Sequence, residues 1–236
     1  MMFVKSQLRK PYSSDAGLTL IECLVAIVVI AITTAAIAPM MIFSVATRVQ
    51  NQKTEQALQL AQSQIDQVRL TVEQGGDYAA RLEELSVVSS PTAATALEIP
   101  PPGTGYGNFI SGDNKATALN HARMFDIDGD EDNDFAVQLF RTKGIVVPAE
   151  DPSLDDTPVT FDVGVRVYDI RAQDATTLLK EPAGLAFTSG EGERRTRPLA
   201  VIYSQITQGD RNGSLCQYWA LNSTAGTPPA RMLCNN

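Results

Sequence analysis

Histidine, cysteine and tryptophan are scarce in this sequence, which has one histidine, three cysteines and one tryptophan among 236 residues. The single histidine, His121, has no second imidazole at a spacing that would support a zinc site. The sequence also lacks a glycine-rich phosphate loop and the nucleophile elbow that carries a catalytic serine. These absences argue against an enzyme, because a lone histidine is more often a surface or packing residue than a general base.

Clustered positive charge is also missing, and the formal net charge is −8. Arginines gather only at Arg194, Arg195 and Arg197, where Glu191 and Glu193 flank them. Sequence-independent attraction to DNA needs clustered cations that are not neutralised by neighbours. We therefore interpret this segment as an ordinary charged loop and expect no nucleic-acid partner.

Charge of either sign is absent from residues 23–47. As an α-helix these residues, about 25 in number, would reach roughly 37 Å, which is enough to cross a bilayer with some tilt. Lys5, Arg9 and Lys10 precede the run, and the positive-inside rule places them in the cytoplasm. The pattern predicts one membrane span, followed by a largely polar domain on the other side of the membrane.

The leader before the span has no apolar stretch of its own, so it lacks the hydrophobic middle of a secretory signal peptide. The leader joins the span through the sequence Gly17-Leu18-Thr19-Leu20-Ile21-Glu22. This junction resembles the processing site of type IV pilin-like proteins. The resemblance implies that a prepilin peptidase cuts between Gly17 and Leu18, that the apolar helix is retained, and that the new N-terminus is methylated. Leu18 departs from the Phe that is usual at this position in pilins.

Glu22 is the one charged residue at the start of this apolar segment. A carboxylate at the centre of a bilayer costs about 2.5 kcal/mol or more unless it is paired or lies near the interface. One explanation is that Glu22 lies in the first helical turn, is favoured by the helix dipole, and reaches the headgroups. The resemblance implies another, in which Glu22 pairs with the α-amino group of Leu18 of its own or a neighbouring subunit during filament assembly.

Pro39 lies inside the expected helix, at a distance from the cleavage site where many pilins bend or melt their long helix. Proline removes one backbone donor and clashes with the preceding turn. We expect a kink or a local loosening at Pro39.

The apolar pattern continues beyond Thr47 as one stripe of a soluble amphipathic helix. The stripe is predicted from residues spaced by three or four, namely Leu58, Ala61, Ile65, Val68 and Val72. Gly75 and Gly76 end the pattern. Residues 18–74 therefore predict one long helix, whose first half lies in lipid or a filament core and whose second half packs on a head domain.

The remaining residues are numerous enough for one compact head with its own core. Proline and glycine predict irregular structure at its start, around Pro91 and from Pro100 to Gly107. Alternating apolar and polar residues predict strands over 135–140, 161–168 and 199–206, and residues 178–185 predict a hairpin or a short helix.

The expected fold class is α+β and pilin-like, with a long N-terminal helix packed on a small antiparallel sheet. Four parts are expected along the chain: a cleaved leader (1–17), a membrane or filament-core helix (18–46), an amphipathic helix (47–74) and a periplasmic or extracellular head (75–236).

Two of the three cysteines, Cys216 and Cys234, lie near the C-terminus. A disulfide between them would restrict the unfolded chain by about 3 kcal/mol and would suit an oxidising periplasm. Two unpaired thiols are the alternative. Pilins commonly have a disulfide in their C-terminal segment, which agrees with the first interpretation. Cys23 lies in the span, where we expect it to behave as a small apolar residue.

An acidic segment precedes the first predicted strand and has carboxylates at alternate positions around Gly129, namely Asp126, Asp128, Asp130, Asp132 and Asp134. Such oxygens suit Ca²⁺, which takes six to eight ligands. The order does not match an EF-hand, because Phe135 stands where a bidentate Glu is needed. Two interpretations remain open: a calcium loop of another type, and a solvated acidic turn.

The resemblance implies a minor pilin or pseudopilin that supports motility or the export of polysaccharide or protein. Its implied partners are the prepilin peptidase, other pilin or pseudopilin subunits, an inner-membrane assembly platform and the lipid bilayer. Residues 161–168 and 197–216 are similar to cyanobacterial pseudopilins linked to hormogonium polysaccharide secretion. The alternative is a single-pass membrane-tethered binding domain, such as a calcium-stabilised adhesin, that does not polymerise.

Overall fold

The computed structural model describes residues 19–75, 77–111, 114–146, 157–184 and 191–209. Its contacts divide the chain into two units, residues 1–50 and residues 51–236. Helix α1 (Leu20–Glu73) is a single helix of 54 residues that belongs to both units. The prediction of one long helix is therefore confirmed. The helix continues through Pro39, and the kink expected there stays a prediction.

Helix α1 ends where the glycine pattern predicted. The Gly75 amide donates to the carbonyl of Val72 at 3.0 Å, and Gly75 has a φ of +68°. This left-handed conformation is open to glycine without the steric penalty that a Cβ would bring. Gly76 lies outside the described residues.

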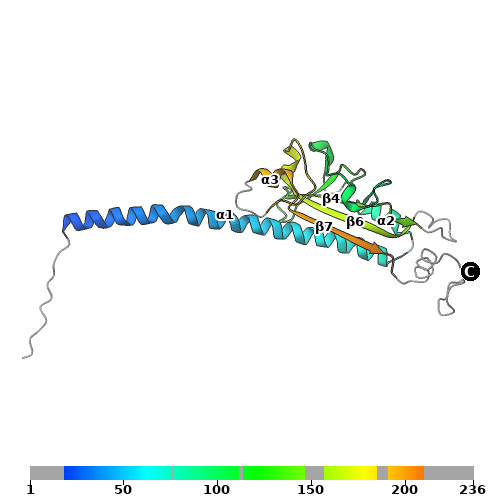
Figure 1. The fold of residues 1–236 in the computed structure, drawn as a ribbon, viewed down its shortest axis with the longest axis horizontal. Helices are drawn as coiled ribbons and strands as arrows, with labels where there is room; N and C mark the ends of the chain where they lie inside the picture. The colour runs from blue at the N-terminus through cyan, green and yellow to red at the C-terminus, as the bar shows by residue number, and fades with distance from the viewer. Residues whose placement is uncertain (1–18, 76, 112–113, 147–156, 185–190, 210–236) are drawn as a thin grey trace, which may run out of the picture. The chain divides into compact units, whose positions relative to one another are not determined.

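The head contains a seven-stranded, mostly antiparallel sheet, so the fold class is α+β as predicted. The order of five strands is β2-β3-β4-β6-β5, while β1 pairs with β4 and β7 pairs with β6 (Figure 1). Among the strand pairs that the structure describes, only β1–β4 and β2–β3 are parallel. The strands are β1 (Val88–Ser89), β2 (Phe109–Ile110), β3 (Ala122–Phe125), β4 (Phe135–Arg141), β5 (Ile145–Val146), β6 (Pro158–Asp169) and β7 (Ala200–Thr207).

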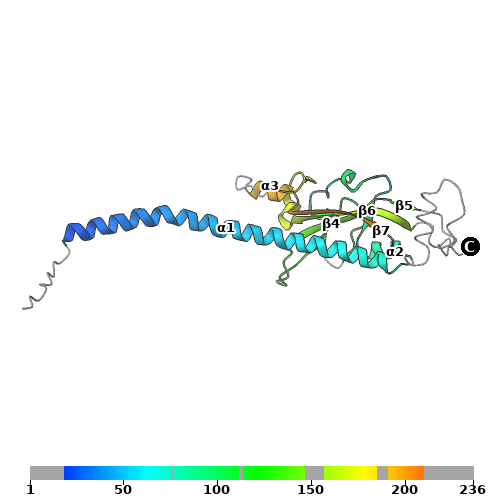
Figure 2. The same cartoon turned by 60° about the horizontal axis from the view of Figure 1, so that its bottom comes forward.

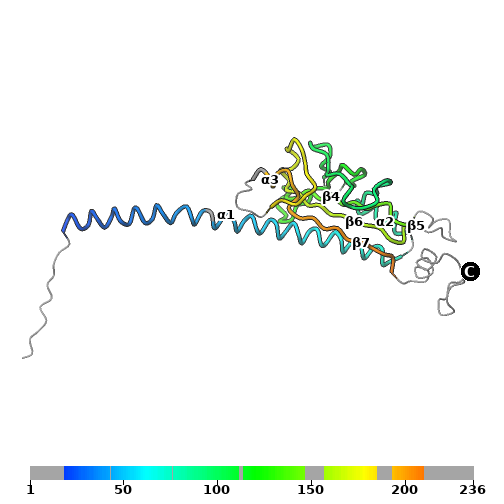
Figure 3. Tube along the Cα trace, in the orientation of Figure 1, coloured from blue at the N-terminus to red at the C-terminus, as the bar shows by residue number. Residues whose placement is uncertain are grey.

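The three predicted strands are confirmed as β4, β6 and β7, the longest strands of the sheet. Strand β6 is central, because β4 pairs with it on one side and β7 on the other, as the tube in Figure 3 shows. Short helices occupy the connections: α2 (Tyr78–Glu84), η1 (Ala96–Glu98), η2 (Tyr106–Asn108), η4 (Ile170–Asp174) and α3 (Glu191–Thr196).

The hairpin or helix predicted over 178–185 is wrong for the described residues 178–184, which form neither. Their backbone groups bond elsewhere: the Leu179 amide donates to the Thr196 carbonyl, and the Ala183 amide donates to the Pro198 carbonyl. The Lys180 ammonium donates to the carbonyl of Leu97 at 2.8 Å. These bonds fix residues 178–184, without regular secondary structure, against Leu97, Thr196 and Pro198.

The second half of α1 covers one face of the sheet (Figure 1). Its buried residues form one apolar cluster with inward-facing valines and leucines of β4 and β6: Ala57, Leu60, Ala61, Ile65, Val68 and Val72. The predicted stripe is correct from Ala61 to Val72 but wrong at Leu58, which is 43% exposed. At about 100° per residue, Leu58 lies toward the margin of the buried stripe, whereas Ala57 and Leu60 lie within it.

The opposite face of the sheet is covered by the irregular segment that follows β1, as the turned view in Figure 2 shows. Arg166 on β6 is fully buried there, with 0% exposure. Its guanidinium donates to the carbonyls of Pro100 (2.9 Å) and Ile99 (2.8 Å), to Gln138 Oε1 (3.0 Å) and to the Tyr203 hydroxyl (3.0 Å). Two carbonyl groups of the irregular segment, those of Ile99 and Pro100, are therefore satisfied by a side chain of the sheet.

Candidate assembly site on the N-terminal helix

The first part of α1 presents an apolar surface that nothing in the single chain covers. Every side chain described between residues 19 and 46 is exposed, including Ile21 (66%), Ile27 (67%) and Met40 (73%). Among the described residues, α1 is the one helix long and apolar enough to cross a membrane. An exposed apolar surface of this extent marks a membrane or protein interaction site.

Two threonine hydroxyls inside this apolar segment are satisfied by the helix itself. The hydroxyls of Thr33 and Thr34 both donate to the carbonyl of Ile30, at 2.9 Å and 2.7 Å. Such internal bonds remove the cost of placing a hydroxyl in a medium without water. Before Arg48, Glu22 is the one side chain of α1 that carries a formal charge.

The start of α1 contains a helix cap that was not predicted from the sequence. The Thr19 carbonyl accepts hydrogen bonds from the amides of Glu22 (3.0 Å) and Cys23 (3.2 Å), and Thr19 Oγ1 lies 3.4 Å from the Glu22 amide. Thr19 and Glu22 thus occupy the first and last positions of the Thr-x-x-Glu capping-box pattern, which is readable in the sequence. This position in the first turn also places a carboxylate at the positive end of the helix dipole.

The reactive group of this site is one exposed carboxylate, that of Glu22, on an otherwise apolar part of α1. Gly17 and Leu18, the residues of the predicted cleavage, lie outside the described residues, and so does the leader. Glu22 is exposed, and its carboxylate is free to accept a cationic partner from outside the chain. An amine is the simplest such partner, because pairing would lower the cost of a carboxylate in a lipid or protein interior.

Residues 12–38 match the protein-family model described as the prokaryotic N-terminal methylation motif. The long N-terminal helix and the mostly antiparallel sheet accompany this motif, and the combination is similar to that of type IV pilin-like proteins. The motif implies processing by a prepilin peptidase and assembly into a pilus, and pilin-like proteins are typically structural subunits and not enzymes. Comparisons with curated proteins and with solved structures find no match.

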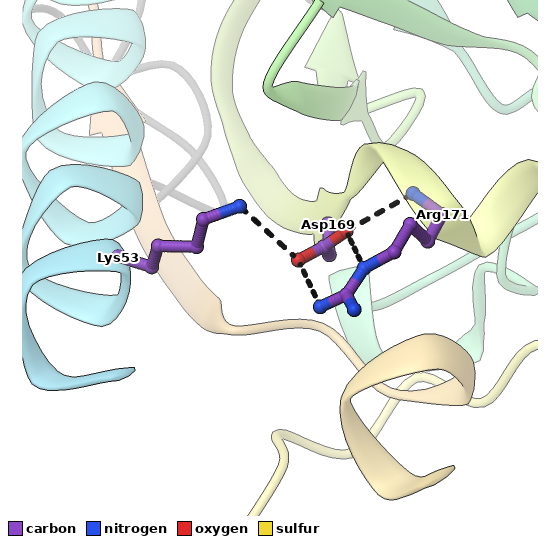
Figure 4. Close-up of polar contacts among 3 residues, drawn as sticks. All are labelled: Lys53, Asp169 and Arg171. Atoms are coloured by element: carbon purple, nitrogen blue, oxygen red, sulfur yellow. Dashed lines mark hydrogen bonds and ion pairs between the residues drawn. The ribbon is translucent and has the colours of Figure 1, made fainter. Parts of the chain in front are cut away.

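A second polar cluster lies within the head, where β6 ends beside α1 (Figure 4). The Asp169 side chain is 2% exposed; Lys53 Nζ lies 3.8 Å from its Oδ2, and Arg171 Nε lies 2.9 Å from its Oδ1. Burial alone would raise the pKa of Asp169, but hydrogen bonds from Arg171 and the charges of Lys53 and Arg171 hold that pKa below its usual value. The carboxylate therefore links the helix to the end of the central strand. Nothing in the sequence spacing indicated this cluster.

The acidic residues before β4 form an exposed turn stabilised by its own carboxylates. Asp126 accepts hydrogen bonds from the amides of Gly129 (2.7 Å) and Glu131 (3.0 Å), and Asp134 accepts from Ile127 (3.1 Å). Asp128 and Asp130 likewise cap the amides two residues further on, with Asp130 accepting from Asp132. These bonds give the turn an internal frame.

The same turn brings carboxylate oxygens of Asp126, Asp128 and Asp130 within 4.8 Å of one another. Desolvation, together with the negative charges of Asp130 and Asp134, raises the pKa of Asp128. Ionisation of Asp128 is therefore disfavoured in the folded turn. Both the calcium interpretation and the solvated-turn interpretation are compatible with this geometry.

The other residues considered as functional candidates either lie in turns and helices of the described structure or lie outside the described residues. The His121 Nδ1 atom accepts the amide of Thr117 at 3.3 Å within a turn. Arg194 and Arg195 lie in the last turn of the short helix α3. Cys23 is exposed on the apolar part of α1, whereas Cys216 and Cys234 lie outside the described residues, so their pairing stays a prediction.

Proposed function

We propose that this chain is a minor pilin or pseudopilin subunit, held in the inner membrane by α1 before it is assembled into a filament. The observation that carries the proposal is the uncovered apolar surface of α1, which bears a single carboxylate at Glu22 next to the predicted cleavage site. A lipid span alone does not need that carboxylate. Pairing of this carboxylate with an amine of a neighbouring subunit during assembly accounts for its presence.

In the proposed mechanism, cleavage after Gly17 exposes the α-amino group of Leu18. That amine, on a neighbouring subunit already in the filament, attracts Glu22 as the helix leaves the bilayer. The apolar side chains of residues 18–46 then exchange lipid contacts for contacts with other helices. Methylation converts this primary amine into a secondary amine that is still protonated at neutral pH, so the methylated N-terminus still pairs with Glu22.

In the proposed arrangement, residues 1–17 are the removed leader and residues 47–74 connect the filament-core helix to the head at 75–236. The head has a periplasmic location before assembly and lies on the filament afterwards. The proposed partners are the prepilin peptidase, sibling pilin or pseudopilin subunits and the inner-membrane assembly platform. The role that we propose is support of motility or of polysaccharide export, following the resemblance of residues 161–168 and 197–216.

Mass spectrometry of the protein purified from native membranes and filaments tests the proposal. We expect the mature chain to begin at Leu18 and to carry a methyl group on its α-amine. An intact leader on the functional protein would contradict the proposal. A processed chain that is always found alone in the membrane fraction would instead support a membrane-tethered binding domain that does not polymerise.

A matched variant makes the processing test sharper. We expect Gly17→Arg to retain the leader, because a bulky charged residue before the cut replaces the small one that the resemblance implies. Asp15→Asn alters the leader without touching the junction and should be processed like the natural chain. Equal processing of both variants would show that cleavage does not depend on this junction.

A further inference from the structure

A polar cavity of about 400 Å³ opens at the end of the sheet where β5 pairs with the start of β6 (Figure 3). Its floor is formed by Thr160 and Asp162 of β6 and by Gln205 of β7, and every residue that lines it belongs to the described part of the chain. The volume lies within the range of small-molecule sites in proteins. The lining includes no residue of α1, so the cavity is separate from the candidate assembly site.

The floor places a carboxylate and a carboxamide side by side. Asp162 and Gln205 are directly opposite each other in the β6–β7 pair, so their Cβ atoms lie about 5 Å apart on one face of the sheet. That face is the one opposite α1, because Asp162 alternates with Phe161 and Val163, which pack in the core with the helix. Asp162 is half-buried, and within the described chain no cationic side chain forms an ion pair with it. Its carboxylate is therefore available to accept hydrogen bonds from a ligand.

The two walls of the cavity are already fixed in the free head. In one wall, the Ala93 amide donates to Ser90 Oγ at 3.2 Å. In the other wall, the Thr142 amide donates to the Asp162 carbonyl (2.9 Å), and Thr142 Oγ1 accepts from the Asp162 amide (3.0 Å). Gly144, in the same wall, lies so close to the sheet that a Cβ would be 2.4 Å from a carbonyl oxygen of β6. A site that is formed before binding loses little conformational entropy when a ligand enters.

The polar and apolar groups of the cavity together favour a neutral saccharide. A pyranose ring has hydroxyl groups at its edge and C–H groups on its faces. The Asp162 carboxylate can accept hydrogen bonds from two adjacent hydroxyls, and the Gln205 carboxamide can donate to one hydroxyl and accept from another. Pro91 and Ile145 supply apolar surface in the walls for the C–H groups, and Ile145 is 49% exposed.

The charges in the cavity disfavour the other classes of ligand. Asp162 in the floor repels an anion, whereas Lys143, which also lines the cavity, repels a cation. One carboxylate is also too few for Ca²⁺, which takes six to eight oxygen ligands. A neutral ligand that is rich in hydroxyl groups meets neither repulsion.

We propose that this cavity binds one hexose unit of a neutral saccharide, with Asp162 and Gln205 holding adjacent hydroxyl groups. The binding is non-covalent, and no bond of the saccharide is broken. The site belongs to the head alone, so the proposal goes beyond the filament role and does not depend on it.

Calorimetric titration of the full chain with tetrasaccharides of α-linked glucose, β-linked glucose, mannose and galactose tests this proposal. The protein is kept in a zwitterionic detergent, because the sugar headgroups of alkyl glycosides would compete. We expect at least one of the four probes to bind with a Kd of about 1 mM or tighter. Because the probes are uncharged, their affinity should not change when the salt concentration is raised.

Two variants of the floor and a matched control connect this binding to the cavity. Asp162→Asn keeps the shape of the side chain but removes its charge, so we expect about tenfold weaker binding. Gln205→Leu should weaken binding about fivefold, because it removes neutral hydrogen bonds. Asp66→Asn makes the first change at an exposed position on α1 and should bind like the natural chain. Unfolding midpoints equal to that of the natural chain would show that the variants have kept their fold.

Three results would overturn the proposal. The first is the absence of binding by all four tetrasaccharides, and the second is equal affinity of the natural chain and both floor variants. The third is binding of a glucosamine tetrasaccharide in place of the neutral probes, with an affinity that falls as salt is raised, which would identify a site for amines. The processing test described above measures the filament role separately, so failure of one proposal leaves the other standing.

Discussion

Arg166 and Gln138 lie directly opposite each other in the antiparallel pair of β6 and β4, and Arg166 Nη1 donates to Gln138 Oε1 at 3.0 Å. The pair is buried, and both side chains also donate to the carbonyl of Pro100. The Arg166 guanidinium carbon lies 4.6 Å from the centre of the Phe140 ring. Backbone carbonyls, an amide oxygen and aromatic faces thus replace water around a buried cation.

Replacing Arg166 with Met should destabilise the head by about 3–5 kcal/mol, because it removes the donor to the buried Ile99 carbonyl and to Gln138 Oε1 and leaves the Pro100 carbonyl with Gln138 alone. Denaturant unfolding of the detergent-solubilised chain measures this change. Arg69→Met is the matched control: its pair with Asp66 is exposed on α1, and we expect a change of at most about 1 kcal/mol. Similar losses in the two variants would contradict the role assigned to Arg166.

The architecture was largely predictable from the sequence, because the long helix and the three main strands follow simple periodicities. Arg166 shows where such reasoning stops. The alternation of Val163, Val165 and Val167 identifies one buried face of the strand. A repeat of every second residue does not indicate which segment covers the other face. That face is covered by a proline-rich segment without a period of its own, through contacts between residues far apart in sequence.

The assembly site was predictable in part for a similar reason. The junction at Gly17 and Glu22 is local, so its pattern is visible in a short stretch of sequence. The capping role of Thr19 was equally local and could have been found from the Thr-x-x-Glu pattern. The Lys53–Asp169 contact joins residues more than one hundred positions apart, so no local sequence pattern predicts it.

Asp169→Asn should reduce the stability of the head by about 1.5–3 kcal/mol at pH 7, because it removes a charged acceptor from three hydrogen bonds of Arg171. The pKa of Asp169 is lowered in the folded state, so the stability that its ionisation contributes is fully present above its unfolded value of about 3.9. This stability is lost as the pH falls through the lower folded value.

Unfolding measured between pH 7 and pH 2 should therefore show the natural chain and Asp169→Asn converging at the acid end. Lys53→Met provides the comparison: the Lys53 side chain is 39% exposed and its Nζ lies 3.8 Å from the carboxylate, so its loss should cost at most about 1 kcal/mol. A difference between the natural chain and Asp169→Asn that does not change with pH would contradict the ionic role of Asp169.

Glu22→Gln separates the two functions that the structure and the proposal assign to this residue. Glutamine also serves in a capping box, so the start of α1 should be preserved while the charge is lost. If Glu22 pairs with an N-terminal amine, a loss of at least about 1.4 kcal/mol should reduce the fraction of subunits in filaments by about tenfold. Immunoblots of sheared filaments and of membranes measure that fraction.

Thr19→Ala is the complementary variant, because it removes the Oγ1 contact at the cap and keeps the carboxylate. We expect it to enter filaments nearly as well as the natural chain. Reduced entry of Thr19→Ala with normal entry of Glu22→Gln would assign the importance of this turn to helix capping and would remove the support for amine pairing.

Leu60→Ala and Leu58→Ala test which face of α1 packs on the head. Leu60 is 8% exposed and lies in the core cluster, so its truncation should cost about 2–5 kcal/mol. Leu58 is 43% exposed, so the same truncation should change the unfolding free energy by at most about 0.5 kcal/mol. Equal losses at the two positions would place the buried stripe where the sequence alone predicted it.

For the acidic turn, we expect the effect of Asp128→Asn on the unfolding temperature to depend on whether a cation is bound. The pKa of Asp128 is raised in the folded state, so its ionised form is disfavoured by folding. With a chelator at pH 7, Asp128→Asn should therefore unfold at a higher temperature than the natural chain, and the difference should disappear as the pH falls below about 4, where the natural carboxyl is protonated in both states. Thermal unfolding followed by circular dichroism measures both temperatures.

Millimolar Ca²⁺ then separates the two interpretations of this turn. The carboxylates of Asp126, Asp128 and Asp130 supply three closely spaced oxygens. A bound ion would stabilise the natural chain and would penalise the loss of one ligand charge, so Asp128→Asn would become the less stable of the two proteins. Glu55→Gln, on the exposed face of α1, controls for general effects of salt on acidic residues. An unchanged order of unfolding temperatures would identify a solvated turn that is held by its own hydrogen bonds.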